Sequence, residues 1–193
     1  MLVRAKSLTE QARRAQIVAA AIEVLAELGY GATSFKQIAA RAGLSSTGLI
    51  SYHFKGKQEL VDSVYAEVRR KFTEFVLERM DRSATAAGEL GAFLSANLWF
   101  LRTHRAHMVA LAQVRPHVSA VDTADDDHRK MADLLREGQR RGEFREFDAD
   151  TVAIFVLALR NGVLARAGDH PEVDLDLCER ELLTMVELAT RRG

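Results

Sequence analysis

Apolar residues recur every three or four positions along most of the chain, which is the spacing of α-helices packed on one side. The first predicted helix follows a capping box of Ser7 and Glu10, and Gly29 is expected to end it. Its apolar face consists of Ile17, Ala21, Val24, Leu25 and Leu28. A second long helix is predicted from Lys57 to about Asp81, with an inner stripe of Val61, Val64, Tyr65, Val68, Phe72, Phe75 and Arg79.

Between these two helices, the segment from Thr33 to Lys57 predicts two short helices joined by a tight glycine turn. Thr33 or Ser34 can cap the first short helix, and Gln37 stands where a capping box with Ser34 requires it. Gly43 can adopt the left-handed conformation that ends a helix. The pattern therefore predicts a helix-turn-helix.

The second short helix is expected to begin at a cap formed by Ser45 or Ser46 and to turn Leu49 inward. Its outward groups would be small or polar, namely Ser46, Thr47, Gly48, Ser51 and Tyr52. A helix with such a face can lie in the major groove of duplex DNA.

Five further helices are predicted in the rest of the chain. They end near His104, near Val118, at Gly142, near Ala165 and close to the C-terminus. The predicted fold is all-α with about nine helices, and residues 1–56 form the helix-turn-helix domain. Residues 57–193 form a second helical domain, in which 57–82 is the connecting helix and 83–91, rich in small residues, is the candidate boundary.

Charge is unevenly distributed although the formal net charge is zero. Residues 1–57 carry eight basic and three acidic side chains, a balance of +5, and the remaining residues balance it with −5. The basic residues include an arm at 1–6 and the pair Arg13 and Arg14, which could touch phosphate or be merely solvated. A basic small domain joined to an acidic larger one is expected when only one end meets nucleic acid.

Composition favours a globular protein of the cytoplasm, with 48% hydrophobic and 28% charged residues. The single cysteine, Cys178, leaves no internal disulfide, and neither a signal peptide nor a run of about 18 apolar residues is evident. His104 and His107 lack a third ligand at fixed spacing, so no metal and no cofactor are expected. Phosphate-binding glycine loops and hydrolase motifs are missing from the sequence, which argues against an enzyme.

The segment from Ile38 to Lys57 resembles the TetR (tetracycline-repressor-like) family of bacterial transcription regulators. The resemblance rests on Ile38-Ala39, on Gly43-Leu44-Ser45, and on Tyr52-His53-Phe54 with Lys57 three residues further on. The distance from Gly43 to Phe54 is one residue longer than the family pattern, which leaves open the register of base-reading residues after Leu49.

The resemblance implies duplex DNA as a partner, with a palindromic operator bound by a homodimer. Tyr52 and Lys57 would mainly anchor phosphate, while Ser46, Thr47 and Ser51 would read bases. The complete set of expected DNA contacts is Thr33, Lys36, Ser45, Ser46, Thr47, Gly48, Ser51, Tyr52, His53 and Lys57.

The last two predicted helices are expected to form the dimer interface. Residues 151–165 are apolar nearly all round, and the final helix has an apolar seam at alternating three- and four-residue spacing. The expected interface residues are Phe155, Leu159, Val163, Leu175, Cys178, Leu182, Met185 and Ala189. The alternative is that the seam only closes the core of one chain.

A small-molecule effector is expected to bind among aromatic and methionine side chains of the second domain, most of which could equally be ordinary core. The candidates are Phe72, Phe75, Phe93, Asn97, Phe100, His104, Met108, Met131 and Phe155. The sequence thus favours a DNA-binding transcriptional regulator, a repressor released by a ligand. Two alternatives stay open: a DNA-binding structural or assembly protein without an effector, and a helical enzyme with an incidental helix-turn-helix.

Overall fold

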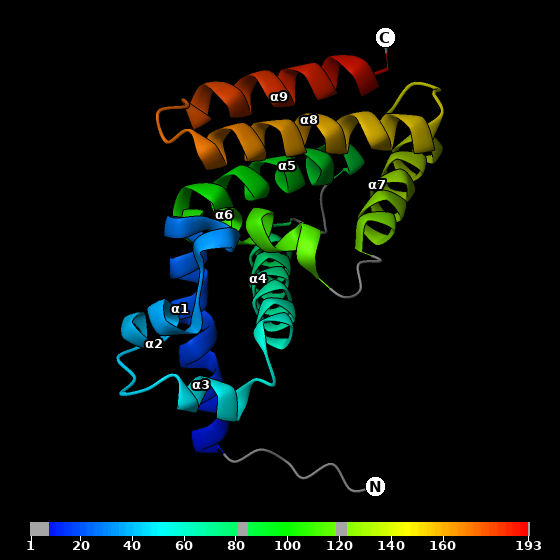
Figure 1. Ribbon diagram of the computed structural model, residues 1–193. Coiled ribbons are helices and arrows are strands. Elements are labelled where there is room, and N and C mark those ends of the chain that lie inside the picture. Colours follow the sequence, from blue (N-terminus) through cyan, green and yellow to red (C-terminus); the bar gives the residue numbers. More distant parts are fainter. Residues whose placement is uncertain (1–7, 81–84, 119–122, 193) are drawn as a thin grey trace, which may run out of the picture. The chain divides into compact units, whose positions relative to one another are not determined.

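The structure is a computed structural model that describes residues 8–80, 85–118 and 123–192. It confirms the all-α prediction, and Figure 1 shows the helices in chain order from blue to red. The described helices are α1 (Leu8–Ala32), α2 (Phe35–Arg41), α3 (Gly48–His53), α4 (Lys57–Arg79), α5 (Ala86–Thr103), α6 (Arg105–Val114), the 3-10 helix η1 (Arg115–His117), α7 (Thr123–Arg140), α8 (Ala149–Asp169) and α9 (Leu175–Thr190). The expected cap at Ser7, the basic arm at 1–6 and part of the candidate boundary lie outside the described residues.

The chain folds as two compact units. The first contains α1 to α3, α4 up to Lys71, and the segment from Ala106 that holds α6 and η1; the second contains the rest. This grouping differs from the predicted division at Lys57, because Ala110 and Val114 of α6 are buried in the same core as the helix-turn-helix. Both α4 and the junction of α5 with α6 therefore cross from one unit to the other.

The core of the first unit is built on α1. Ile17 and Ala21 of α1, Ile50 of α3 and Val64 of α4 are completely buried, and Ile38 of α2 is 1% exposed. Each large apolar side chain buried in this way contributes about 1.5–3 kcal/mol of transfer free energy. The short helices α2 and α3 are held by this shared core, since helices of six or seven residues are marginal by themselves.

Gly29 breaks α1 where the sequence predicted the helix to stop. Its φ of 75° and ψ of 168° are not helical, so α1 consists of a long helix before Gly29 and a short helical segment that reaches Ala32. An L-residue would be strained at that positive φ. The predicted end at Gly29 therefore corresponds to a kink followed by a short helical turn.

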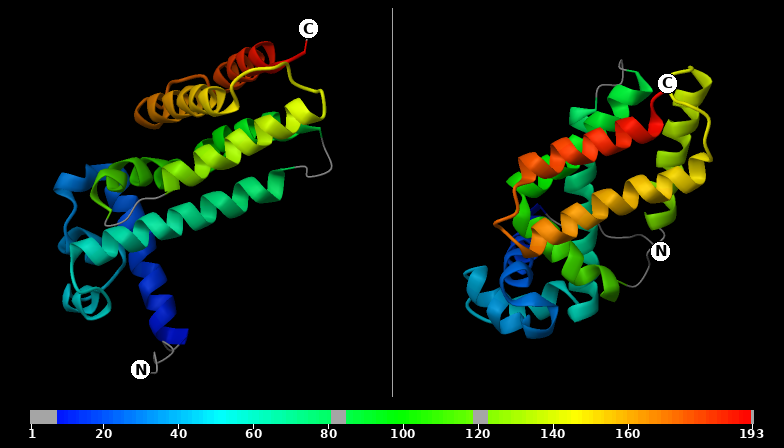
Figure 2. Two further views of the ribbon diagram at one scale, coloured as in Figure 1. Left: turned by 90° about the vertical axis from the view of Figure 1, so that its right-hand side faces the viewer. Right: turned by 90° about the horizontal axis from the view of Figure 1, so that it is seen from above.

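In the second unit, α5 packs against α7, α8 and α9, and α8 lies between α7 and α9 in chain order and contacts both. Figure 2 shows α8 and α9 running side by side. Leu94, Leu98, Phe100 and Leu101 of α5 are at most 1% exposed, so α5 forms the centre of this core. Phe144 fits against Gly138 of α7, where a Cβ atom would meet the ring at 2.1 Å.

Two helices, α1 and α8, are long and apolar enough to cross a membrane by length and composition alone. This differs from the sequence-based expectation that no segment qualifies, because mean hydropathy tolerates a few polar residues within a span. Core helices pass the same test, and the buried residues of α1 form the core of the first unit.

Candidate nucleic-acid interface

The turn between α2 and α3 has the geometry that the sequence predicted. Ser34 caps α2, and its backbone N–H donates to Gln37 Oε1 at 2.7 Å, which completes the capping box. After α2, Gly43 takes φ 64°, its N–H donates to Ala40 O at 3.2 Å, and the N–H of Leu44 donates to Ala39 O at 2.9 Å. This pair of bonds is a Schellman motif, which satisfies carbonyls at the end of a helix.

The start of α3 differs from the prediction. Thr47, not Ser45 or Ser46, is the N-cap residue, and it makes no side-chain capping bond. The serine hydroxyls are thereby left on an exposed loop before the helix. Without a cap bond, α3 depends on its tertiary contacts for order.

The inward residue of α3 is Ile50, which is completely buried, and not Leu49, which is 38% exposed. The prediction for Leu49 was wrong because two adjacent apolar residues on a six-residue helix do not reveal which of them faces the core. Phe54, just after α3, is 1% exposed and anchors the other end. The face opposite Ile50 is consequently presented to solvent.

Most of the predicted DNA contacts lie on this outward face or near it. Exposed residues in and before α3 are Ser45, Ser46, Thr47, Gly48, Ser51 and Tyr52, and Tyr52 is 77% exposed. Lys36 of α2 is also exposed, while His53 is half-buried with its ring edge-on to Tyr52. The structure thus brings eight of the ten residues onto, or beside, solvent-facing parts of the helix-turn-helix.

Thr33 is the clear exception among these candidates. Its side chain is buried, with 7% of the residue exposed, and its hydroxyl donates to Gly29 O at 2.7 Å. A hydroxyl committed to the backbone of the α1 kink is not available to a phosphate. Thr33 therefore belongs to the support of the helix-turn-helix.

Arg14 of α1 connects the end of α3 to α4. Its guanidinium donates to His53 O, to Glu59 Oε1 at 3.2 Å and to Ser63 Oγ at 3.3 Å, and it lies 4.1 Å from the centre of the Phe54 ring. A cation at a helix C-terminus also interacts favourably with the helix dipole. The sequence left open whether Arg14 touches phosphate or is merely solvated, and the structure instead gives its guanidinium partners inside the protein.

A second arginine joins α2 to α1. Arg41 donates to Glu23 Oε2 at 3.0 Å and to both carboxylate oxygens of Glu27. The hydrogen bond from Arg41 lowers the pKa of Glu27, and the bonds to Glu27 and Glu23 raise the pKa of Arg41. Gln16 of α1 adds a bond from Nε2 to Ala42 O at 2.6 Å, which satisfies a carbonyl at the end of α2.

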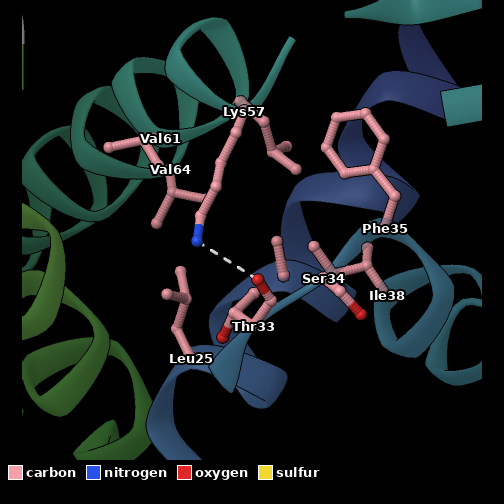
Figure 3. Close-up of a pocket in the computed structure, with 10 residues that line it drawn as sticks. Leu25, Thr33, Ser34, Phe35, Ile38, Lys57, Val61 and Val64 are labelled. Atoms are coloured by element: carbon pink, nitrogen blue, oxygen red, sulfur yellow. Dashed lines mark hydrogen bonds between the residues drawn. The ribbon is translucent and has the colours of Figure 1, made fainter. Parts of the chain in front are cut away.

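Lys57, the remaining candidate, reaches back from the first turn of α4 (Figure 3). Its Nζ donates to Thr33 O at 3.2 Å and to Tyr30 O at 2.9 Å, and it lies 4.0 Å from the centre of the Tyr30 ring. Beneath it is an apolar cavity of about 30 Å³ that is lined in part by Leu25. A cavity of this volume is about the size of one water molecule and far too small for an organic ligand. Two of the three ammonium donors are thus used inside the protein.

Sequence reasoning missed a set of contacts that join α6 and η1 to Tyr30 of α1 and to the start of α4. The rings of Tyr30 and His117 stack at 3.6 Å, and the Tyr30 N–H donates to Gln113 Oε1 at 3.1 Å. Gln58, next to Lys57, donates to His117 O at 2.7 Å. Only folding brings these segments together, since Tyr30 and Gln113 are 83 residues apart in the chain.

Comparisons with known proteins agree with this geometry. A family model for bacterial regulatory proteins of the tetR family matches residues 17–64. The HTH-type transcriptional repressor KstR2 of Mycobacterium tuberculosis is 30% identical over 156 residues, which cover 75% of this chain and 76% of that repressor. The chain belongs to the TetR family.

Other relatives of this TetR-family protein support the assignment. The fatty acid metabolism regulator protein of Bacillus subtilis is 29% identical over 137 residues, covering 68% of this chain and 70% of that protein. A tetR-family regulatory protein from Rhodococcus RHA1 has the same fold, with a TM-score of 0.78, 20% identity and coverage of 94% and 98% of the two chains. A regulator from Saccharomonospora viridis in complex with choline matches at a TM-score of 0.78 and 22% identity, over 95% of this chain and all of that one (100%).

Family membership confirms the predicted class of function. This TetR-family protein is a DNA-binding transcriptional regulator and not an enzyme. The exposed face of α3 carries small and polar groups, which are compatible with that function.

The candidate effector residues of this TetR-family protein fall into several groups. Phe72, Phe75, Phe100 and His104 form one aromatic cluster, in which Phe100 and His104 stack at 4.6 Å and both other phenylalanines meet Phe100 edge-on at 5.2 Å.

A second group contains Phe93 and Asn97, beside the buried Arg160. Arg160 donates to Asn97 Oδ1 at 3.3 Å and lies 5.3 Å from the centre of the Phe93 ring. Met131 is buried in α7, and Phe155 of α8 is 59% exposed. Met108 belongs to the first unit, unlike the other candidates.

Proposed function

We propose that this protein is a cytoplasmic repressor that binds a two-fold symmetric operator as a homodimer and is released by a small molecule. The observation that supports it most is the exposed, mostly polar face of α3 on a helix-turn-helix braced by Arg14, Arg41 and Lys57. A recognition helix must present its outer face in a fixed orientation, and these contacts with α1 and the α2 turn supply that orientation. The relative KstR2 is named a repressor, which favours repression over activation.

Dimerisation is supported by an apolar face of the second unit that its own chain leaves exposed. On α8, Ile154, Phe155 and Leu159 are 55%, 59% and 38% exposed; on α9, Met185 and Leu188 are 51% and 55% exposed. The two helices run side by side, so these residues belong to neighbouring helices of one unit (Figure 2). A second copy of the chain, related by two-fold symmetry, would bury them.

The proposed interface differs in part from the predicted seam. Leu182 is only 4% exposed and packs within its own chain, and Leu175, Cys178 and Val163 are half-buried. Only Met185 and Ala189 of the α9 seam are exposed. One side of α9 thus closes the core of its own chain, and the other side presents the apolar surface on which we base the proposed interface.

The effector is proposed to be a small molecule bound near the aromatic cluster of Phe72, Phe75, Phe100 and His104, whose rings can contact an apolar chain or a quaternary ammonium group. This cluster includes residues of α4, the helix that also carries Lys57 at its other end. A ligand acts by differential affinity for the DNA-binding state, with couplings of about 1–3 kcal/mol in typical cases. The descriptions of two similar proteins, a regulator in complex with choline and a fatty acid metabolism regulator protein, suggest choline and a fatty acid as the first probes.

Selection of bound sequences from random duplex DNA tests the regulator itself. We expect enrichment of one motif with two inverted half-sites whose centres are about 34 Å, or a multiple of that, apart. Recovery of no motif would contradict sequence-specific regulation and favour a DNA-binding structural or assembly protein.

Calorimetry with and without the recovered operator tests the effector. Reciprocity requires operator DNA to weaken the binding of an effector by the same factor by which the effector weakens operator binding. Choline and palmitate are titrated first. A probe that binds equally in both titrations is not the effector, and operator binding that resists a broad panel of apolar ligands would favour the alternative without an effector.

A further inference from the structure

Leu49 is an apolar side chain on the face of α3 that is otherwise small or polar. It is 38% exposed, whereas the next residue, Ile50, is completely buried. Tyr52 follows Leu49 by three positions and is 77% exposed, so the two side chains lie on the same side of the helix. The outward face of α3 therefore combines an apolar group with an aromatic one.

The residues that precede Leu49 are small or polar. The preceding residue is Gly48, which has no side chain, and the loop before it carries the exposed residues Ser45, Ser46 and Thr47. The core contacts of α3 are made by Ile50 and, beyond the helix, by Phe54. A single exposed leucine is ordinary on a protein surface, but Leu49 lies on the face of α3 that is proposed to contact DNA.

The base edges in the major groove are hydrogen-bond donors and acceptors, with one apolar exception, the C5-methyl group of thymine. Serine and threonine hydroxyls can bond several bases, so the neighbours of Leu49 discriminate weakly. An apolar side chain gains nothing from a cytosine or guanine edge and leaves those polar groups without a partner.

We propose that Leu49 reads the C5-methyl group of one thymine in each operator half-site. The inference rests on the proposed binding of a two-fold symmetric operator through α3. It adds a specificity-determining residue that the sequence assigned to the core, and it predicts a thymine at a fixed position in both halves of the site.

Replacing thymines by deoxyuridine tests the contact, because that change removes only the methyl group. Each thymine of the selected operator is replaced in turn, in both half-sites together, and affinity is measured by fluorescence anisotropy at fixed salt. At one symmetric pair of positions we expect a loss of about fourfold per half-site, the value of burying one methyl-sized group. Other replacements should change affinity by less than that.

The same scan with variants assigns the effect to Leu49. Leu49→Ala should bind the unmodified operator less tightly and lose the deoxyuridine penalty, whereas Leu49→Met should keep it. Leu28→Ala is the matched control, since Leu28 is a 46% exposed leucine of α1 in the same unit, and it should behave like the wild type.

Three outcomes overturn the proposal. One is an operator whose thymines all tolerate deoxyuridine, and another is a Leu49→Ala variant that retains the full penalty; either leaves the function as a regulator intact. The third is the absence of any selected operator, which overturns the proposed function and this inference together.

Discussion

At the scale of residues, the structure separates side chains that can touch DNA from those that position them. Thr33 and Arg14 use their polar groups inside the protein: the Thr33 hydroxyl donates to Gly29 O, and the Arg14 guanidinium donates to a carbonyl at the end of α3. Ser51 and Tyr52 stay exposed. Lys57 has two carbonyl partners, and its third ammonium donor remains available for a phosphate.

Replacing Lys57 by alanine should therefore have two effects. Losing the bonds to Tyr30 O and Thr33 O should lower the free energy of unfolding by about 1 kcal/mol. Losing a phosphate contact should flatten the dependence of log affinity on log salt by about one unit. Urea unfolding measures the free energy of unfolding, and salt titrations with random duplex DNA measure the salt dependence of the affinity.

Lys55→Ala is the matched control for stability, since Lys55 is an exposed lysine two residues earlier. It should leave the free energy of unfolding unchanged. A Lys57→Ala variant with lowered stability and an unaltered salt slope would show that Lys57 only braces the fold.

At the scale of elements, the sequence was sufficient for both ends of α2, where local chemistry decides the outcome, but it did not predict the N-cap of α3. Ser34 with Gln37 predicted the start of α2, and Gly43 predicted its end, because capping and left-handed turns depend on neighbouring residues. Ile50 and Leu49 could not be distinguished, because both are apolar and tertiary packing selects between them. The contacts of α6 with Tyr30 likewise depend on long-range packing.

The contact between α1 and α2 should weaken in acid. The hydrogen bond from Arg41 holds the pKa of Glu27 below its ordinary value of 4.5. A carboxyl whose pKa is lowered on folding adds stability above its ordinary pKa, and this stability is lost as pH falls through the lowered pKa. Glu27→Gln should therefore be less stable than the wild type near neutral pH and equally stable in strong acid.

Urea unfolding at a series of pH values measures this difference. Glu181→Gln, a change at an exposed glutamate of α9, serves as control and should track the wild type throughout. A deficit of Glu27→Gln that does not change with pH would argue against the Arg41 ion pair as its cause.

At the scale of the whole molecule, the account requires two chains. Leu188 and Leu182 of α9 form a matched pair for testing this, since the first is 55% exposed and the second 4% exposed. Leu188→Glu should preserve the fold and yield monomers at micromolar concentration in sedimentation experiments. Leu182→Glu should instead unfold the chain, with a loss of about 3 kcal/mol or more, because it buries an unpaired charge.

A Leu188→Glu variant that sediments as the wild type does would move the interface elsewhere. A wild-type protein that is monomeric at the same concentration would contradict the proposed homodimer. Circular dichroism of both variants separates dissociation from unfolding.

The most direct test of the central claim is the stoichiometry of the complex with the selected operator, measured by native mass spectrometry on the full duplex and on a duplex with one half-site. The account predicts an even number of chains on the full site and much weaker binding to the half-site, because one recognition helix alone contacts too little DNA. A single chain that binds the full site and the half-site with equal affinity would contradict it.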